Sequence, residues 1–177
     1  YVGTATGGLP PDSLVVNYGR WHGEASDFKI AEIVVFDEAL GDVDVGKVSD
    51  YLLGKIKKLP KVRALDFPAR PTYWLTAEGY DKRGYWANRG SGPDLESVLR
   101  SGKARVSALA GHGASAKFPA VAGDAKTSLD LGRIVPPRYT VCSLTRYAGG
   151  LEGRILTGDK VDWAHGQWKG RAGVAHY

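Results

Sequence analysis

The sequence predicts an all-β protein, an antiparallel sandwich with one short helix. Glycine and proline are frequent, with 24 and 9 residues among 177, and they separate many short β-rich runs. This pattern is typical of antiparallel chains with many turns. One apolar run near the start has the pattern of an interior strand, and the segment after it has helical spacing. A chain of this length can bury one hydrophobic core, or form two partial ones joined by a linker.

The first of these elements is a strand from Phe28 to Phe36, expected to be covered on both faces. Asp37 and Glu38 follow it and are expected to end it. A strand that is apolar on both parities belongs in the interior of a sheet rather than at its edge. One parity carries Phe28, Ile30, Val34 and Phe36, interrupted by Glu32, and the other carries Ala31, Ile33 and Val35.

The second element is one short amphipathic helix near residues 42–54. Val45, Val48 and Leu52 fall at helical spacing, and the first turn is acidic, which suits the helix dipole. Gly46 and Gly54 each weaken the helix by about 1 kcal/mol relative to Ala. We therefore expect the helix to depend on docking against the sheet.

Two later stretches have weaker patterns. Residues 94–100 place three apolar side chains on one helical face behind a capping aspartate, which predicts one helical turn. Residues 101–126 are dominated by Ala, Gly and Ser, which predicts a long connection on the surface.

The strand and helix at the start resemble the C-terminal signature of laminin-G-like domains, which are concanavalin A-like jelly-roll sandwiches. The matching residues are "IAEIVVFDEAL" at 30–40 and the following "D-x-D-V-x-x-V-x-x-YL". Later segments are similar to the opening of the same family, with an aromatic strand followed by a W-x-N turn. These segments are 73–80, 86–88, 90–95, 128–132, 139–147, 153–157 and 166–170.

The resemblance implies that the C-terminal part of a module, at about 1–56, precedes the N-terminal part of another, at 72–177. Residues 57–71 lie between them, with three prolines and several Lys and Arg, and are expected to be an extended linker. Three interpretations stay open. The chain is a window from a longer tandem array, a circular permutant, or a subunit that exchanges strands with its neighbours in a head-to-tail polymer.

Charge is distributed unevenly along the chain. Residues 1–60 carry six Lys and Arg against nine Asp and Glu, whereas residues 61–177 carry eighteen against ten. Opposite charges on the two parts favour association of copies at close range. The Lys and Arg of the second part are scattered and accompany no nucleic-acid motif, so no nucleic-acid partner is expected. No run of about 18 apolar residues is present, so membrane insertion is not expected.

No catalytic motif is found. Glycan hydrolases of this broad class need two carboxylates about 5 to 9.5 Å apart, which calls for an E-x-D-x-E pattern along one strand, and the sequence has none. The four histidines lack the spacing of a zinc protease, and no phosphate-binding glycine loop occurs. We therefore expect no enzyme, no catalytic residue and no cofactor.

Two further residue types were considered for structural or metal roles. Some laminin-G-like domains bind calcium, and Asp159 and Asp162 share one turn-like segment, but Lys160 lies between them and calcium is left unassigned. Cys142 is the single cysteine and lies in a strand-like segment, which favours a buried thiol over an intermolecular disulfide.

Binding is expected to depend on aromatic platforms flanked by polar groups. Trp21 follows a β-run on a turn-like segment and is the leading candidate, whereas Trp168 matches a family position that usually packs in the core. The complete candidate set is Trp21, His22, Asn17, Arg20, Trp163 and His165.

Together these observations predict a non-catalytic structural or adhesive module of an extracellular or cell-surface assembly. Its expected partners are other copies of itself or neighbouring modules, and glycans. The alternative is a carbohydrate-binding, lectin-like module of a larger secreted protein.

Overall fold

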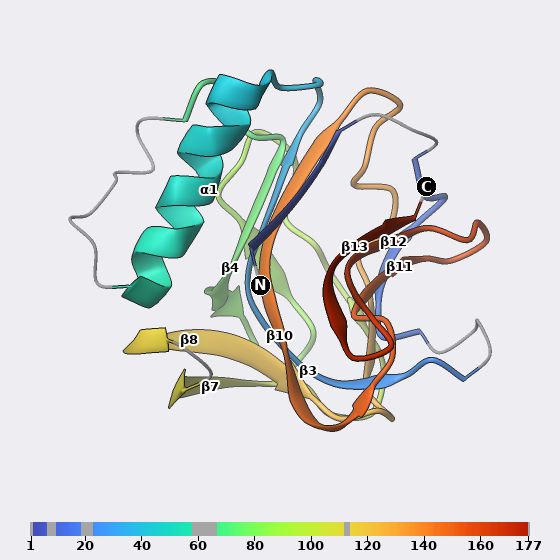
Figure 1. The fold of residues 1–177 in the computed structure, drawn as a ribbon. Helices are drawn as coiled ribbons and strands as arrows, with labels where there is room; N and C mark the ends of the chain where they lie inside the picture. Colours follow the sequence, from blue (N-terminus) through green and yellow to red (C-terminus); the bar gives the residue numbers. More distant parts are fainter. Residues whose placement is uncertain (1, 7–9, 19–22, 58–66, 112–113, 177) are drawn as a thin grey trace.

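The computed structural model describes residues 2–6, 10–18, 23–57, 67–111 and 114–176. They form two antiparallel β-sheets that face each other, with one helix on the outer side of the first sheet (Figure 1). The all-β sandwich with a single short helix is therefore confirmed for these residues. The finer expectation, a jelly-roll connection of the strands, stays a prediction.

The first sheet, called sheet A, has seven strands. Five strands are hydrogen-bonded in the order β1-β10-β3-β4-β5. Strand β8 also pairs with β3, on the same edge as β4, and β7 pairs with the other edge of β8. The strands are β1 (Val2–Thr6), β3 (Ser26–Phe36), β4 (Tyr73–Tyr80), β5 (Trp86–Asn88), β7 (Arg105–Gly111), β8 (Ala114–Gly123) and β10 (Thr140–Glu152).

The second sheet, called sheet B, has six shorter strands in the order β13-β12-β11-β2-β9-β6. All of its pairs are antiparallel. The strands are β2 (Leu14–Val16), β6 (Leu99–Ser101), β9 (Ser128–Asp130), β11 (Leu156–Gly158), β12 (Ala164–Trp168) and β13 (Arg171–His176).

Strand β3 is the interior strand that its apolar pattern predicts. It pairs with β10 on one side and with both β4 and β8 on the other. The register slips between Leu144 and Thr145 of β10, where Ala31 of β3 is the extra residue of a bulge. Before the bulge, the even-numbered residues Phe28 and Ile30 face the core between the sheets. After it, the odd-numbered residues Ile33 and Val35 face that core.

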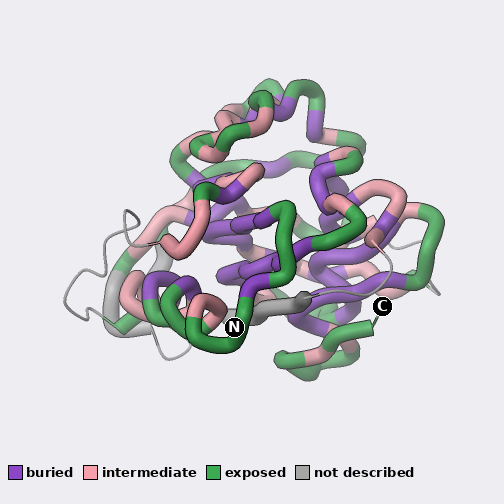
Figure 2. Tube along the Cα trace, turned by 90° about the horizontal axis from the view of Figure 1, so that it is seen from above, coloured by how far each residue is buried: buried purple, intermediate pink, exposed green. Residues whose placement is uncertain are grey.

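The main core lies between the two sheets. Two fully buried tryptophans, Trp86 and Trp163, are its largest side chains. Figure 2 shows the buried residues gathered in the interior and the exposed ones along turns. The core also includes Leu14, Val16, Phe28, Ile30, Ile33, Val35, Leu75, Leu129, Tyr139, Val141 and Leu156.

A second apolar layer lies between sheet A and helix α1 (Asp42–Lys57). The helix begins as predicted and continues three residues beyond the predicted end. Val48 and Leu52 are fully buried against the sheet, which accounts for helix formation despite two glycines in the segment. Within the described residues no helix has the length and apolar character needed to cross a membrane.

One carboxylate, Glu32, is fully buried beneath the helix. Lys55 of α1 forms an ion pair with it, and the Trp74 indole N–H donates a hydrogen bond to it. Burial and the neighbouring Glu32 raise the pKa of Tyr51, which also hydrogen-bonds this carboxylate. Because a buried charge is costly without partners, this group of side chains fixes the position of α1 on the sheet.

The two predicted segments, 1–56 and 72–177, pair with each other. Strands β1 and β3 of the first segment both pair with β10 of the second, and β2 pairs with β9 and β11. Within one chain the described strands therefore form one sandwich. Most of the predicted linker, residues 58–66, lies outside the described residues, and Phe67 in its remaining part packs against the layer under α1. The origin of the segments in a laminin-G-like module stays a prediction.

Two local predictions were wrong. Residues 94–100 form no helical turn, because Leu95 makes an isolated bridge to Trp86 and Leu99 begins β6. Residues 101–126 are not a surface connection but contain the antiparallel pair β7 and β8. Their small residues concealed the strands, although Ala120 and Val121 pack in the interior.

Candidate functional site

The predicted binding residues fall into three groups. Trp21, His22 and Arg20 lie outside the described residues. Trp163 and His165 are buried, each about 1% exposed, and their rings stack with centroids 6.0 Å apart. The Trp163 indole N–H donates to the Tyr139 hydroxyl at 3.2 Å. These two side chains belong to the interior, so the structure corrects their interpretation as an exposed sugar platform.

Asn17, the remaining candidate, has a structural role. It is 2% exposed, and its backbone φ of 56° lies in the left-handed region, which Asn tolerates better than most residues. Its amide nitrogen donates to the carbonyls of Asp124 and Thr127 at 3.0 and 2.8 Å, and its amide oxygen accepts from the backbone N–H of Ser26. With every polar atom of its amide engaged, Asn17 ties β2 to the start of β3 and to the turn before β9.

Trp168 is only partly buried, although it was expected in the core. Its indole N–H donates to Glu24 at 2.7 Å, and the cations of Arg154 and Lys169 lie 5.2 and 4.7 Å from its ring centre. Arg154 itself pairs with Glu24 at 2.7 Å and also with Asp162. The polar edge and the π-face of this tryptophan thus already contact charged groups of the protein.

The two aspartates considered for calcium are paired with cations. Asp159 lies 3.5 Å from Arg100, and Asp162 contacts Arg154 and lies 3.4 Å from His176. Across the described part of the chain no three metal-binding side chains come together. Calcium therefore stays unassigned. The Cys142 thiol is buried, as its strand-like surroundings predicted.

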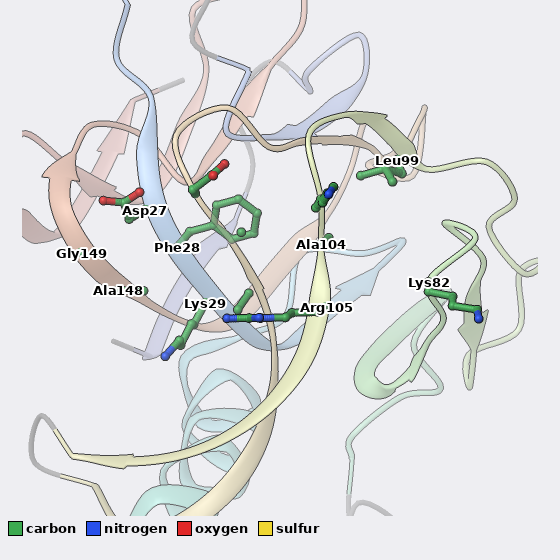
Figure 3. A pocket seen from close by; sticks show the side chains of 13 residues that line it. Asp27, Phe28, Lys29, Lys82, Leu99, Ala104, Arg105, Ala148 and Gly149 are labelled. Atoms are coloured by element: carbon green, nitrogen blue, oxygen red, sulfur yellow. The ribbon is translucent and has the colours of Figure 1, made fainter.

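A cleft of about 840 Å³ lies at the end of sheet A where β3 begins. The start of β3, the end of β8 and the segment from β6 to β7 form its walls, and Figure 3 shows the labelled side chains around it. A Cβ at Gly123 would lie 2.7 Å from the Phe28 ring, so glycine permits this close approach of β8 to β3. The lining residues are Asp27, Phe28, Lys29, Lys82, Leu99, Lys103, Ala104, Arg105, Ala122, Gly123, Asp124, Ala148 and Gly149.

Three cations form a row across the strands at this cleft. Lys29 of β3 is directly opposite Arg146 of β10 on one side and Ala122 of β8 on the other, and Ala122 is opposite Arg105 of β7. Residues directly opposite in antiparallel strands point to the same face. With strands about 4.8 Å apart, Lys29 is one strand from Arg146 and two strands, about 10 Å, from Arg105. Figure 3 shows Lys29 and Arg105 at the same part of the cleft, with Lys82 farther away.

The pKa of Lys29 is lowered, first by partial desolvation and then by the positive charges of Arg146 and Arg105. This is the direction expected when like charges gather without enough negative charge nearby. Among the described residues, Lys29, Lys82, Lys103 and Arg105 form no ion pair, whereas many other cations of the protein do. The cleft thus presents positive charge that forms no ion pair with a described residue.

The two carboxylates of the cleft stabilise its loops. Asp27 accepts hydrogen bonds from the backbone N–H groups of Ala125 and Leu151 at 3.1 and 3.2 Å. Asp124 accepts from the Thr127 hydroxyl and the Lys126 N–H, and these bonds hold its pKa below the usual value. Both side chains are engaged in local structure, and neither forms an ion pair with Lys29 or Arg105.

Sequence reasoning missed this cleft. Lys29 stands alone within an apolar run, and Arg105 and Arg146 are far from it in the sequence. The surplus of Lys and Arg after residue 60 indicated a basic surface, but it did not indicate where on the protein that surface lies. Only the strand register brings these three side chains together.

Comparisons of the chain with family models, with curated proteins and with solved structures gave no match. The laminin-G-like resemblance therefore stays a prediction that depends on the sequence motifs alone.

Proposed function

We propose that the chain is a non-catalytic structural or adhesive module of an extracellular or cell-surface assembly, and that it holds an acidic partner in the basic cleft. The single observation that carries this proposal is the row of cations at Lys29 and Arg105, which form no ion pair with a described residue. Like charges gathered across the strands of one sheet oppose folding. An anion bound between them removes that repulsion, so part of the binding free energy comes from relieving it.

The chemistry of the cleft suits binding better than catalysis. Its carboxylates, Asp27 and Asp124, accept hydrogen bonds from neighbouring backbone N–H groups. The pKa of Asp124 is lowered, first by the hydrogen bond from the Thr127 hydroxyl and then by that from the Lys126 N–H, which is opposite to the raised pKa that a general acid needs at neutral pH. A carboxylate fixed in this way stabilises a loop and transfers protons poorly.

A lectin-like function is the second candidate, and the same cations favour one form of it. Sugars that carry sulfate or carboxylate groups would match the charge of the cleft. Neutral sugars usually stack on exposed aromatic rings. Among the described tryptophans, Trp86 and Trp163 are fully buried, and the indole N–H groups of Trp74 and Trp168 donate to carboxylates of the protein. Trp21 and His22 remain the predicted platform for a neutral sugar.

Binding to dextran sulfate, with neutral dextran as control, tests the proposal. The double variant Lys29→Glu/Arg105→Glu reverses the charge of the row. Arg138→Glu/Arg171→Glu makes the same change in net charge at two exposed positions away from the cleft. We expect the first variant to lose at least about tenfold in affinity and the second less than about threefold, because short-range pairs are screened least by salt.

Wild-type binding to dextran sulfate should weaken steeply between 0.05 and about 0.5 M salt, since the Debye length falls as salt rises. Equal loss of affinity in both double variants would mean that net charge alone attracts the polymer. Absence of binding to dextran sulfate at low salt would refute the proposal outright.

A further inference from the structure

Lys29 differs chemically from the two arginines that lie with it in the row of cations. A guanidinium stays protonated in proteins, whereas a lysine amine loses its proton more easily when it is desolvated or lies near other cations. Both conditions hold for Lys29, whose pKa is lowered by desolvation first and then by Arg146 and Arg105. At neutral pH Lys29 is therefore the free amine, which is the nucleophilic form, for a larger fraction of the time than a fully solvated lysine.

No described carboxylate pairs with Lys29 to stabilise its charged form. Asp27 stands two residues earlier on the same strand, and residues at this spacing point to the same face. Its two oxygens accept hydrogen bonds from the backbone N–H groups of Ala125 and Leu151. The acid nearest to Lys29 along β3 is thus engaged with the backbone of two loops.

The space at Lys29 suits a small molecule. Lys29 is partly exposed and lines the cleft, whose volume of about 840 Å³ is typical of small-molecule sites. Its neighbours on the flanking strands are small: Ala122 of β8, directly opposite it, and Ala148 and Gly149 of β10 also line the cleft. A small ligand can therefore reach the amine without displacing a large side chain.

Arg105 supplies a group that binds the acidic part of such a ligand. A guanidinium binds a carboxylate through two parallel N–H···O hydrogen bonds, which fix the orientation of the carboxylate. Arg105 is two strands from Lys29, about 10 Å, through the pairs that both residues make with β8. Figure 3 shows the two side chains at the same part of the cleft. A ligand held by Arg105 at one end can thus present its other end to Lys29.

We propose that Lys29 forms a reversible Schiff base with a small carbonyl compound that also carries a carboxylate, and that Arg105 binds this carboxylate. The inference rests on the proposed function, because it names a class of small acidic ligand for the same cleft. The amine lone pair attacks the carbonyl carbon, and the C=O electron pair moves to the oxygen. This oxygen leaves as water with the two amine hydrogens as the C=N bond forms. Hydrolysis reverses the reaction, and no oxidant or reductant is needed.

Binding of the carboxylate affects the reaction in two opposite ways. It offsets part of the charge of Arg105 and so reduces the fraction of Lys29 that is free amine. It also holds the carbonyl group beside the amine, and such positioning raises the effective concentration of a reactant by several orders of magnitude. Desolvation, and not Arg105, is the largest cause of the lowered pKa of Lys29. The gain from positioning therefore exceeds the loss of free amine.

Trapping with cyanoborohydride, followed by peptide mass mapping, provides the test. Reduction fixes each Schiff base as a secondary amine on the lysine where it formed. The probe is para-formylbenzoate, and its neutral match is para-formylbenzamide, in which an amide replaces the carboxylate. The reference lysine is Lys82, which is exposed and lines the same cleft away from the row. The acidic probe should label Lys29 at least about tenfold faster than Lys82, and the neutral probe at most about threefold faster.

Three variants separate the roles in this site. Lys29→Arg keeps the charge but cannot form a Schiff base, so it should lose the label and keep its affinity for dextran sulfate within about threefold. Arg105→Gln should lower the ratio of the acidic to the neutral labelling rate at Lys29 by about fivefold or more. The ratio is used because Arg105 also affects the pKa of Lys29, which changes both rates equally. The control Lys82→Arg should leave the labelling of Lys29 unchanged, and circular dichroism checks the fold of each variant.

Equal labelling of Lys29 and Lys82 by the acidic probe would overturn the proposal. A preference for Lys29 of the same size with both probes would also overturn it, because the carboxylate would then have no role. Dextran sulfate separates this proposal from the proposed function. If the protein binds dextran sulfate through the row but shows no preferred labelling, the Schiff base is wrong and the cleft stays a site for acidic polymers. If Lys29 is labelled selectively but dextran sulfate does not bind, the proposed function fails and the site for a small acidic carbonyl compound stands.

Discussion

Removing Lys55 should destabilise the protein by leaving the Glu32 carboxylate buried without its cation. Glu32 has no exposed side-chain area, and Lys55 is 28% exposed. Breaking a fully buried ion pair costs about 3 to 5 kcal/mol, and the partial exposure of Lys55 lowers the expected cost of Lys55→Met to about 2 to 3 kcal/mol. For a chain of this size that loss corresponds to a fall in Tm of about 4 to 12 °C.

The assay is urea unfolding at neutral pH, with Lys47→Met as the control. Lys47 lies on the same helix and pairs with Asp44 at 2.8 Å, but its side chain is 52% exposed. The control should cost less than about 0.5 kcal/mol. The double variant Glu32→Met/Lys55→Met should recover most of the loss, because an apolar pair of similar volume avoids the buried charge.

The single variants Lys55→Met and Glu32→Met and the double variant together form a double-mutant cycle, which isolates the interaction between Glu32 and Lys55. If Lys55→Met costs no more than Lys47→Met, then Glu32 does not depend on the helix for its charge partner. The docking of α1 would in that case depend on apolar contacts alone.

Three further predictions concern other parts of the fold. Asn17→Ala should cost about 2 to 4 kcal/mol in urea unfolding, because it leaves the buried Ser26 N–H, the buried Thr127 carbonyl and the partly buried Asp124 carbonyl without their partner; a loss below about 1 kcal/mol would contradict the role assigned to this amide. The Cys142 thiol should react with a thiol reagent only as fast as the protein unfolds, and rapid reaction in the native state would show that it is accessible. Burial raises the pKa of Tyr147 to about 12, so the folded state keeps this proton after the unfolded chain has lost it at about pH 10. Its contribution to stability is therefore complete below about pH 10 and is lost as the pH rises through 12, and Tyr147→Phe should reduce the steepness of alkaline unfolding.

The interior of sheet A could be predicted from sequence because burial leaves a local pattern. The apolar run from Phe28 to Phe36 indicated a strand covered on both faces, and the spacing of Val48 and Leu52 indicated the helix that covers one of them. The Ala31 bulge could not be predicted, since it depends on the register with β10, and that register is set by residues more than a hundred positions away.

The β7–β8 pair and the basic cleft escaped prediction for related physical reasons. Small residues such as Ala120 and Ala122 carry little periodic signal, although they pair well in a sheet. Lys29 can be recognised as part of a basic site only once Arg105 and Arg146 are known to lie near it, and this proximity is a property of the folded sheet. Two further aromatic candidates for binding, Trp163 and His165, instead lie inside the sandwich, whereas the leading candidate, Trp21, lies outside the described residues.

The most direct test of the cleft is NMR mapping with a sulfated oligosaccharide at low salt. The account predicts that backbone amide shifts change first and most strongly at Lys29, Lys103 and Arg105, and that the changes saturate with increasing ligand. Arg138 and Arg171, which are equally charged and exposed, should change little. Changes of similar size at all five residues, without saturation, would show that the protein attracts anions through its net charge and that the cleft is not a binding site.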